Sequence, residues 1–250
     1  MLHVLILYCH PEPHSFNAAL KDVAIEVLEN EGHTVEVADL YAENFDPVER
    51  PGHFTTRADA EVFSALTEQR HHFESNTLPG KIQHEIDRLW RADLVILQFP
   101  LWWHAQPAML KGWFDRVFVY GGLYSGSRRF DRGPLRGRRA LCSVTTGAPA
   151  ATFSRFGRSA DITTLMWPIH CSLYYVGFEV LAPQLTYGVQ GGGLSYQAEA
   201  SFRCQLEADK TRWARRLTQL ETEAPLPFSG WADWDEDGVL RETHPLRWRP

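Results

Sequence analysis

The sequence predicts an α/β fold, with a single domain built around a parallel β-sheet. Short apolar segments alternate along the chain with longer segments of helical periodicity. The first of these segments, residues 2–9, is apolar almost without interruption, which is typical of a parallel strand buried on both faces. The chain has 250 residues, of which 44% are hydrophobic and 22% are charged. This length supports one large core, and this composition argues against intrinsic disorder.

Five segments predict strands, because each is short, apolar or alternating, and followed by a polar turn. They lie at residues 2–9, 34–40, 93–99, 139–145 and 178–185. Five longer segments predict helices, at residues 16–31, 81–90, 107–118, 161–176 and 196–220. Ser15 is a suitable N-cap for the first helix, Gly32 suits its end, and Pro107 suits a first helical turn. Strands and helices that alternate at this spacing indicate a parallel sheet with right-handed crossovers.

Two segments depart from this pattern. Residues 42–78 form a long insertion with turn-forming Pro pairs, which predicts an irregular excursion from a domain of residues 1–221. Residues 222–250 form a C-terminal tail that contains Trp231, Trp234 and Trp248. Since solvated tails rarely carry several indoles, we expect these rings to dock on the body of the protein or on a partner subunit.

Charge, hydropathy and cysteine content argue against a nucleic-acid-binding, membrane-spanning or metal-binding protein. The 25 basic and 31 acidic residues give a formal net charge of −6, so nothing in the charge favours a nucleic-acid partner. No apolar run approaches the ~18 to 20 residues that span a bilayer, and the N-terminus carries no leader pattern. The four cysteines lie far apart without a CxxC pair, which predicts no metal site and reduced thiols. We therefore expect a cytoplasmic protein without membrane insertion.

The sequence also lacks several catalytic motifs. No GxGxxG follows a strand, no GxxxxGK[ST] loop occurs, and no GxSxG turn is present. A Rossmann dehydrogenase, a P-loop NTPase and a serine hydrolase of the nucleophile-elbow type are therefore disfavoured. In an open parallel sheet, ligands bind beyond the carboxyl ends of the strands. The loops after the first, third and fourth predicted strands are the candidates.

The loop after the first strand offers an anion site. It runs from His10 to Ser15 and continues as Phe16 and Asn17 at a helix start, where unpaired backbone N–H groups favour an anion. Ser15 adds a hydroxyl, and His10 can donate to a phosphate. The alternative is an ordinary N-cap behind a proline turn.

The loops after the third and fourth strands suit a flat aromatic ligand. Pro100 and Leu101 lead into Trp102, Trp103 and His104, and adjacent indoles in a polar turn offer a flat wall to an aromatic ring. The alternative is that the two indoles fold back into the core. The loop after the fourth strand supplies hydroxyl groups and a close backbone approach, from Thr145, Thr146 and Gly147.

Taken together, these segments resemble the NAD(P)H:quinone oxidoreductases, a flavodoxin-like family that includes the mammalian DT-diaphorases. The resemblance covers about residues 2–188 and includes the specific run Leu110-Lys111-Gly112-Trp113-Phe114. It is carried by His10 with residues 15–17, and by residues 92–101, 107–118, 131–134, 145–147, 167–169 and 183–187.

The resemblance implies a doubly wound five-stranded parallel sheet of order 2-1-3-4-5 with helices on both faces. It also implies a homodimer with FAD at the subunit interface, and FMN is the less favoured cofactor. NAD(P)H would reduce the flavin in a ping-pong, two-electron reaction through flavin N5, and a quinone or related acceptor would then take the hydride.

By the same resemblance, the cofactor-binding residues divide among three loops. His10, Ser15, Phe16 and Asn17 would hold the pyrophosphate and the adenosine side. The isoalloxazine would lie against the loop after the third strand, which holds Pro100, Leu101, Trp102, Trp103 and His104. The polar edge of the ring would lie against the loop after the fourth strand, which holds Thr145, Thr146 and Gly147. Tyr124 would cap the substrate pocket from the partner subunit.

The chain also departs from the family pattern. Phe153 and Ser159 stand where mammalian members carry a Tyr and a His, and Gly126 replaces a second pocket Tyr. Phe has no hydroxyl, and Ser is not protonated near neutral pH. We therefore assign no catalytic acid or base, and the predicted substrate-binding residues are Tyr124, Gly126 and Phe153.

Two alternative functions share this core. One is an FMN-dependent azo- or nitroreductase. The other is a regulatory flavoprotein, such as the ancillary subunits of potassium-efflux systems. The long insertion at residues 42–78 and the Trp-rich tail favour the larger, FAD-dependent enzymes.

Overall fold

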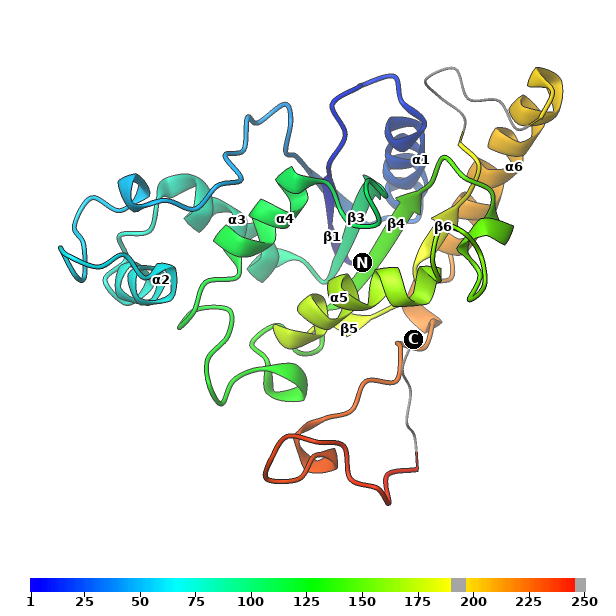
Figure 1. The fold of residues 1–250 in the computed structure, drawn as a ribbon. Coiled ribbons are helices and arrows are strands. Elements are labelled where there is room, and N and C mark those ends of the chain that lie inside the picture. Colours follow the sequence, from blue (N-terminus) through cyan, green and yellow to red (C-terminus); the bar gives the residue numbers. More distant parts are fainter. Residues whose placement is uncertain (190–196, 246–250) are drawn as a thin grey trace.

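The sheet has the predicted fold class and strand order. The structure is a computed structural model that describes residues 1–189 and 197–245. The strands of these residues form one parallel sheet in the order β2-β1-β3-β4-β5, and β6 also pairs with β4 (Figure 1). The strands are β1 (His3–Tyr8), β2 (Thr34–Asp39), β3 (Leu94–Pro100), β4 (Arg139–Thr145), β5 (Glu179–Val180) and β6 (Gln184–Thr186).

The structure divides the predicted fifth strand, residues 178–185, into two short strands. Glu179 of β5 lies beside Arg139 at the start of β4, and Thr186 of β6 lies beside Thr145 at its end. Pro183 lies between β5 and β6. Because proline has no backbone N–H, it cannot donate a hydrogen bond to a neighbouring strand, and the ladder is interrupted there.

Helices cover both faces of the sheet. They are α1 (Phe16–Asn30), α2 (Ala65–Glu74), α3 (Gly80–Arg91), α4 (Ala108–Val117), α5 (Ile162–Tyr175) and α6 (Glu199–Leu217). Short 3₁₀ turns occur at Pro51–His53, Phe130–Arg132, Ala150–Phe153, Leu220–Thr222 and Trp231–Asp233. Ser15 caps α1 as predicted: its hydroxyl accepts a hydrogen bond from the backbone N–H of Ala18 at 3.2 Å. Gly32 follows the end of α1 with φ +83°. The predicted start of the last helix, Tyr196, lies outside the described residues.

The insertion contains a helix that its sequence pattern did not predict. α2 lies inside residues 42–78 and stands apart from the sheet, at the left of Figure 1. Its inward face carries Glu68 and His72, which are buried. The Glu68 carboxylate accepts hydrogen bonds from Arg57 Nε at 2.7 Å and from the backbone N–H of Ala58 at 2.9 Å. Polar tertiary contacts hold this helix, so its apolar periodicity is too weak to read in the sequence.

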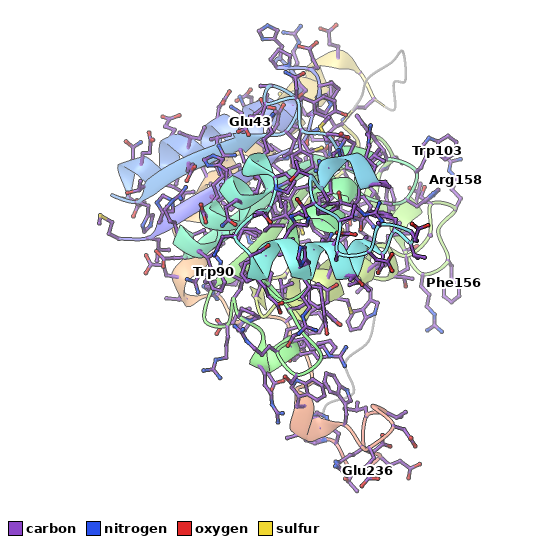
Figure 2. All side chains as sticks on the ribbon, turned by 90° about the vertical axis from the view of Figure 1, so that its left-hand side faces the viewer. Glu43, Trp90, Trp103, Phe156, Arg158 and Glu236 are labelled. Atoms are coloured by element: carbon purple, nitrogen blue, oxygen red, sulfur yellow. The ribbon has the colours of Figure 1, made fainter. Side chains whose placement is uncertain are left out.

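The C-terminal tail contacts the body of its own chain. The rings of Trp231 and Trp234 lie 5.9 and 4.9 Å from the ring of Phe130. Beyond these contacts the tail projects outward, with Glu236 at its outer end (Figure 2). Trp248 lies outside the described residues.

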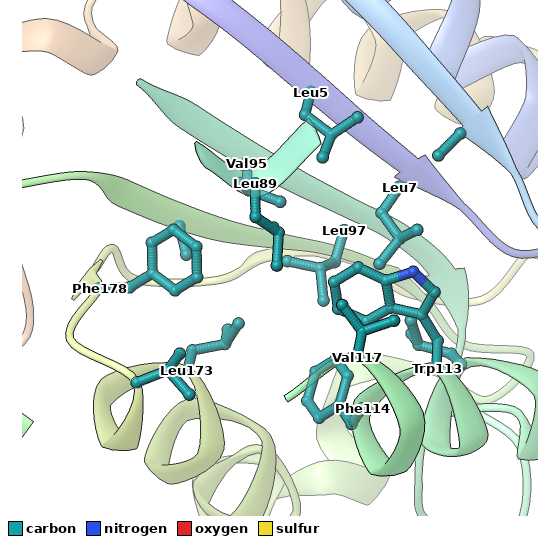
Figure 3. Close-up of a cluster of buried hydrophobic side chains, with 14 of the residues drawn as sticks. Leu5, Leu7, Leu89, Val95, Leu97, Trp113, Phe114, Val117, Leu173 and Phe178 are labelled. Atoms are coloured by element: carbon teal, nitrogen blue, oxygen red, sulfur yellow. The ribbon is translucent and has the colours of Figure 1, made fainter. Parts of the chain in front are cut away.

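The core has two layers because the strand side chains alternate. Leu5 and Leu7 of β1 pack with α3, α4 and α5, and the close-up in Figure 3 shows this cluster around the indole of Trp113. Val4 and Ile6 point to the other face, which α1 and α6 cover. With both faces covered, the carboxyl ends of the strands and their loops are the part of the sheet left open to a ligand. None of the helices within residues 1–189 and 197–245 is long and apolar enough to span a membrane.

Candidate functional site

A pocket of about 650 Å³ lies at the carboxyl ends of β1, β3 and β4. Ten of the twelve predicted cofactor-binding residues line it: His10, Ser15, Phe16, Asn17, Pro100, Leu101, Trp102, Thr145, Thr146 and Gly147. Other lining residues are His14, Ala19, Val189, Phe202 and Leu206. We call this cavity the strand-end pocket. Three loops separated widely in sequence therefore meet where the parallel topology brings them together.

The start of α1 gives the strand-end pocket an anion-binding corner. Ser15 Oγ accepts from the N–H of Ala18, and no hydrogen bond to the backbone N–H groups of Phe16 and Asn17 is formed by any described residue. These N–H groups lie at the positive end of the helix dipole. The corner can therefore bind a phosphate or pyrophosphate.

A buried hydrogen-bond chain fixes the loops around this corner. The amide of Asn17 donates from Nδ2 to Thr145 Oγ1 at 2.9 Å, and Gln98 Nε2 donates to Asn17 Oδ1 at 2.9 Å. Gln98 Oε1 and Thr186 Oγ1 are buried without a partner among the described residues. The chain joins α1, β3 and β4 under the pocket. Our sequence reasoning missed Gln98, although a lone amide near the end of an otherwise apolar strand was the available signal.

The loop after β3 is a tight two-residue turn. The backbone N–H and C=O groups of Trp102 and Ala105 bond to each other at 3.0 and 3.1 Å, and the two residues between them, Trp103 and His104, have φ values of +50° and +62°. Left-handed backbone at both central positions is the geometry of a type I′ turn. It is unfavourable for bulky residues and often occurs at functional sites.

The indoles of this turn do not fold back into the core. Trp102 is 40% exposed and lies against the His10 ring at 5.9 Å, whereas Trp103 is 95% exposed. Figure 2 shows Trp103 at the edge of the molecule, on the same side as Phe156 and Arg158. The structure therefore places Trp103 and His104 next to the strand-end pocket without bringing them into its lining.

The loop after β4 presents further hydrogen-bonding groups. Thr146 donates its backbone N–H to Thr186 O at 2.9 Å and its hydroxyl to Ala148 O at 2.9 Å. The backbone N–H groups of Gly147 and Ala148 have no partner within residues 1–189 and 197–245. They remain available for the carbonyl or ring nitrogen atoms of a ligand.

A second pocket, of about 820 Å³, lies between the insertion, α2, α4 and α5. We call it the aromatic pocket, because Phe114, Phe118, Tyr124 and Tyr175 line it. The rings of Tyr124 and Tyr175 meet edge to face at 5.3 Å. Burial raises the pKa of Tyr124, so this phenol stays protonated. The remaining lining residues are Pro47, Val48, Glu49, Ala65, Leu66, Gln69, Lys111, Asp115, Cys171, Ser172 and Val176.

The predicted substrate-binding residues do not meet within one chain. Tyr124 lines the aromatic pocket, whereas Phe153 is buried in the loop after β4 and packs against Tyr187 at 5.7 Å. Gly126 is exposed, and a Cβ added to it would meet no atom within 4 Å. Ser159 lies in the same loop as Phe153, where its backbone N–H donates to Thr152 O at 2.9 Å.

The described part of the chain holds no group of three or more His, Cys, Asp or Glu side chains arranged to hold a metal ion. The arrangement can instead bind a phosphorylated, planar ligand: N–H groups at the α1 start for its anion, and a Trp turn with further N–H groups for its ring.

The chain is similar to known proteins over most of its length. The flavodoxin-like fold family model matches residues 2–209. The chain is 38% identical over 233 residues to human ribosyldihydronicotinamide dehydrogenase [quinone], covering 92% of this chain and 96% of the relative. It is also 38% identical to rat NAD(P)H dehydrogenase [quinone] 1, over 90% of this chain and 80% of the relative. A solved structure from Klebsiella pneumoniae that carries the name quinone reductase superposes with a TM-score of 0.84 at 33% identity, covering 96% of this chain and 94% of that one.

Proposed function

The chain belongs to the family of flavodoxin-like NAD(P)H:quinone oxidoreductases, and from this premise we propose that it is an enzyme that reduces quinones with NAD(P)H through bound FAD. The observation that carries the proposal is the strand-end pocket, where ten predicted cofactor-binding residues meet. A flavin held there would supply hydride transfer, from NAD(P)H in one half-reaction and to the acceptor in the other.

The residues of the strand-end pocket fit a flavin dinucleotide. The N–H groups of Phe16 and Asn17, which no described residue bonds, suit the pyrophosphate, with His10 and Ser15 beside them. Phe16, and Phe202 and Leu206 of α6, also line this pocket and offer apolar surface for an adenine. This apolar lining favours FAD over FMN.

The other two loops fit the isoalloxazine. Pro100, Leu101 and Trp102 give one wall of the pocket, and the Trp103 and His104 turn stands beside it. The hydroxyls of Thr145 and Thr146 and the free N–H of Gly147 suit the polar edge of the ring.

A homodimer completes the proposed active site. Tyr124 and its aromatic pocket are separate from the strand-end pocket of the same chain. A second copy could set its aromatic pocket against the flavin of the first, and the acceptor would then bind between them. The apolar and aromatic lining suits a quinone ring.

No acid–base residue is part of this proposal. Phe153 has no hydroxyl and is buried, and Ser159 is a poor proton donor near neutral pH. Hydride transfer depends mainly on how donor and acceptor are oriented, so activity does not require the missing pair.

We also place the enzyme in the cytoplasm. All four cysteines are free thiols, as expected in a reducing compartment. Burial raises the pKa of Cys9 to about 12, which keeps this thiol protonated and unreactive.

An anaerobic titration tests the function. The purified protein should be yellow, and denaturation should release FAD, identified by its mass. NADPH should bleach the flavin, and a quinone should restore its colour. Release of FMN would favour the azo- or nitroreductase function, and flavin that NAD(P)H fails to bleach would favour a regulatory flavoprotein. A colourless protein that binds neither flavin would refute the proposal.

A further inference from the structure

Two polar side chains that line the aromatic pocket, Gln69 and Ser172, already donate hydrogen bonds to other groups of the protein. Gln69 Nε2 donates to Glu49 Oε2 at 3.2 Å and to the backbone oxygen of Asp115 at 2.9 Å. The hydroxyl of Ser172 donates to the backbone oxygen of Pro168 at 2.8 Å. A ligand in this pocket must therefore accept its hydrogen bonds from other lining side chains.

Two phenols remain. Neither Tyr124 nor Tyr175 donates a hydrogen bond to any residue in the described ranges. They differ in one respect: Arg129 Nη1 donates to the hydroxyl oxygen of Tyr175 at 2.8 Å. A cationic donor at a phenol oxygen polarises the O–H bond and makes that group the stronger donor.

Aromatic rings, and no carboxylate of the described residues within ion-pair distance, surround the guanidinium of Arg129. Within residues 1–189 and 197–245 its guanidinium forms no ion pair with a carboxylate, and its Nε is buried without a partner. It lies instead against three aromatic rings, 5.5 Å from the centre of Tyr175, 5.3 Å from Trp231 and 5.6 Å from Phe130. Cation–π attraction holds the cation there without cancelling its field.

The tail fixes this arrangement. Trp231 Nε1 donates to the backbone oxygen of Arg129 at 3.0 Å, and the backbone N–H of Trp231 donates to Asp131 Oδ1 at 3.0 Å. Between them, Phe130 has φ +57°, a left-handed conformation that a bulky residue adopts only when its surroundings enforce it. The structure thus constrains Arg129 from both the tail and its own backbone.

We propose that Tyr175 donates a hydrogen bond to the carbonyl oxygen of the quinone acceptor, and that Arg129, held by Trp231, is the positioning residue that polarises this phenol. The inference rests on the proposed function, in which the acceptor lies between the aromatic pocket and the flavin of a second copy. A hydride brings two electrons and one proton to the acceptor, so negative charge develops on its oxygen until a second proton arrives from water. Tyr175 keeps its own proton and stabilises that charge.

This role supplies a polar group to a site that lacks the family's Tyr and His, which Phe153 and Ser159 replace. The tail also gains a function in the reaction, because Trp231 holds Arg129, and Arg129 polarises the Tyr175 phenol that bonds the acceptor.

The two half-reactions test the proposal in stopped-flow experiments on the holoenzyme. Tyr175→Phe keeps the ring and removes the donor, so reoxidation of the reduced enzyme by a quinone should slow about tenfold or more. Arg129→Met should slow it about fivefold, because the phenol remains but is no longer polarised. Bleaching by NADPH, and reoxidation by ferricyanide, which has no carbonyl oxygen, should stay within about twofold in both variants.

A second measurement needs no turnover. Titration of the oxidised holoenzyme with 4-nitrophenol, followed by absorbance, reports how well the pocket stabilises a bound phenolate. Tyr175→Phe should weaken phenolate binding about tenfold. Unchanged quinone reoxidation in Tyr175→Phe would overturn the proposal, whatever the phenolate titration gave.

Tyr174→Phe is the matched control. This neighbouring phenol donates to the backbone oxygen of Ser229 at 2.9 Å, on the tail side of α5, and does not line the aromatic pocket. Its loss should leave quinone reoxidation within about twofold, and a slowing equal to that of Tyr175→Phe would mean that both act only through the fold. A wild-type chain that reduces no quinone refutes the proposed function and this inference with it, whereas an active wild type matched by Tyr175→Phe refutes the inference alone.

Discussion

The two pockets of this protein are built on different principles. The strand-end pocket lies where the loops after β1, β3 and β4 meet, and a hydrogen-bond chain of Gln98, Asn17 and Thr145 joins these elements. The aromatic pocket is framed by side chains from the insertion, α2, α4 and α5. Backbone geometry follows from the fold class, but side-chain packing depends on each residue. We therefore expect substitutions at the strand-end pocket to alter cofactor binding, and those at the aromatic pocket to alter acceptor use.

The largest expected loss of stability comes from a substitution beside the aromatic pocket. A Cβ added to Gly112 of α4 would overlap the backbone of Pro47, which borders that pocket. Gly112→Val should lower the free energy of unfolding by about 3 kcal/mol, because the insertion must move off α4. Urea unfolding measures this, and surviving protein should keep flavin while its KM for quinone rises.

Gly52→Ala is the control for that substitution, since a Cβ there meets no atom within 4 Å. Its stability should stay within about 0.5 kcal/mol of wild type. If Gly112→Val proved equally harmless, the close approach of α4 and the insertion would not be a constraint on the pocket.

Asn17→Ala should damage the strand-end pocket. Asn17 is buried and bonds both Gln98 and Thr145, so the variant leaves two polar groups without partners. We expect a loss of about 2 kcal/mol in the free energy of unfolding and about tenfold weaker flavin binding. Calorimetric titration of the apoprotein measures the second effect. The exposed Asn30, at the end of α1, provides the control variant Asn30→Ala, and equal flavin affinity in the two would contradict the role of the hydrogen-bond chain.

The helix that forms a wall of the aromatic pocket should be sensitive to acid. Burial lowers the pKa of His170 in α5 from the usual 6.5 to about 4, and its Nε2 has no partner among the described residues. Between these values the unfolded chain binds the proton more readily than the folded one. The free energy of unfolding should therefore be fully retained above pH 6.5 and fall by about 1.4 kcal/mol per pH unit towards pH 4.

His170→Leu should flatten this slope. Urea unfolding at a series of pH values compares the two proteins, and an identical pH dependence would show that another group controls the acid sensitivity of the fold.

The smallest effect on stability should come from Trp103→Ala, because this indole is 95% exposed. The melting temperature should not change, whereas flavin affinity should fall about fivefold as a bound flavin loses the contact proposed for this turn. Phe156→Ala removes a comparably exposed ring, 93% exposed, from a neighbouring loop and should leave flavin binding unaltered. Equal cofactor occupancy in Trp103→Ala and wild type would remove Trp103 from the flavin site.

The sequence by itself determined the sheet and the location of the strand-end pocket. Apolar segments and caps such as Ser15 are local features, and the parallel topology then brings the loops after β1, β3 and β4 to one edge. For that reason ten residues chosen from loops distant in sequence line one pocket.

Only the tertiary structure decided the rest. The buried Glu68 and His72 fix α2 through polar contacts, so the sequence of α2 shows no apolar periodicity. Pro183 divides the last predicted strand into β5 and β6. The contacts of Arg129 with Tyr175 and Trp231 join three distant parts of the chain through side chains and one backbone carbonyl group. Periodicity reports how one segment meets the core, but a contact between side chains from separate segments has no local signature, so folding must bring them together before the site can be recognised.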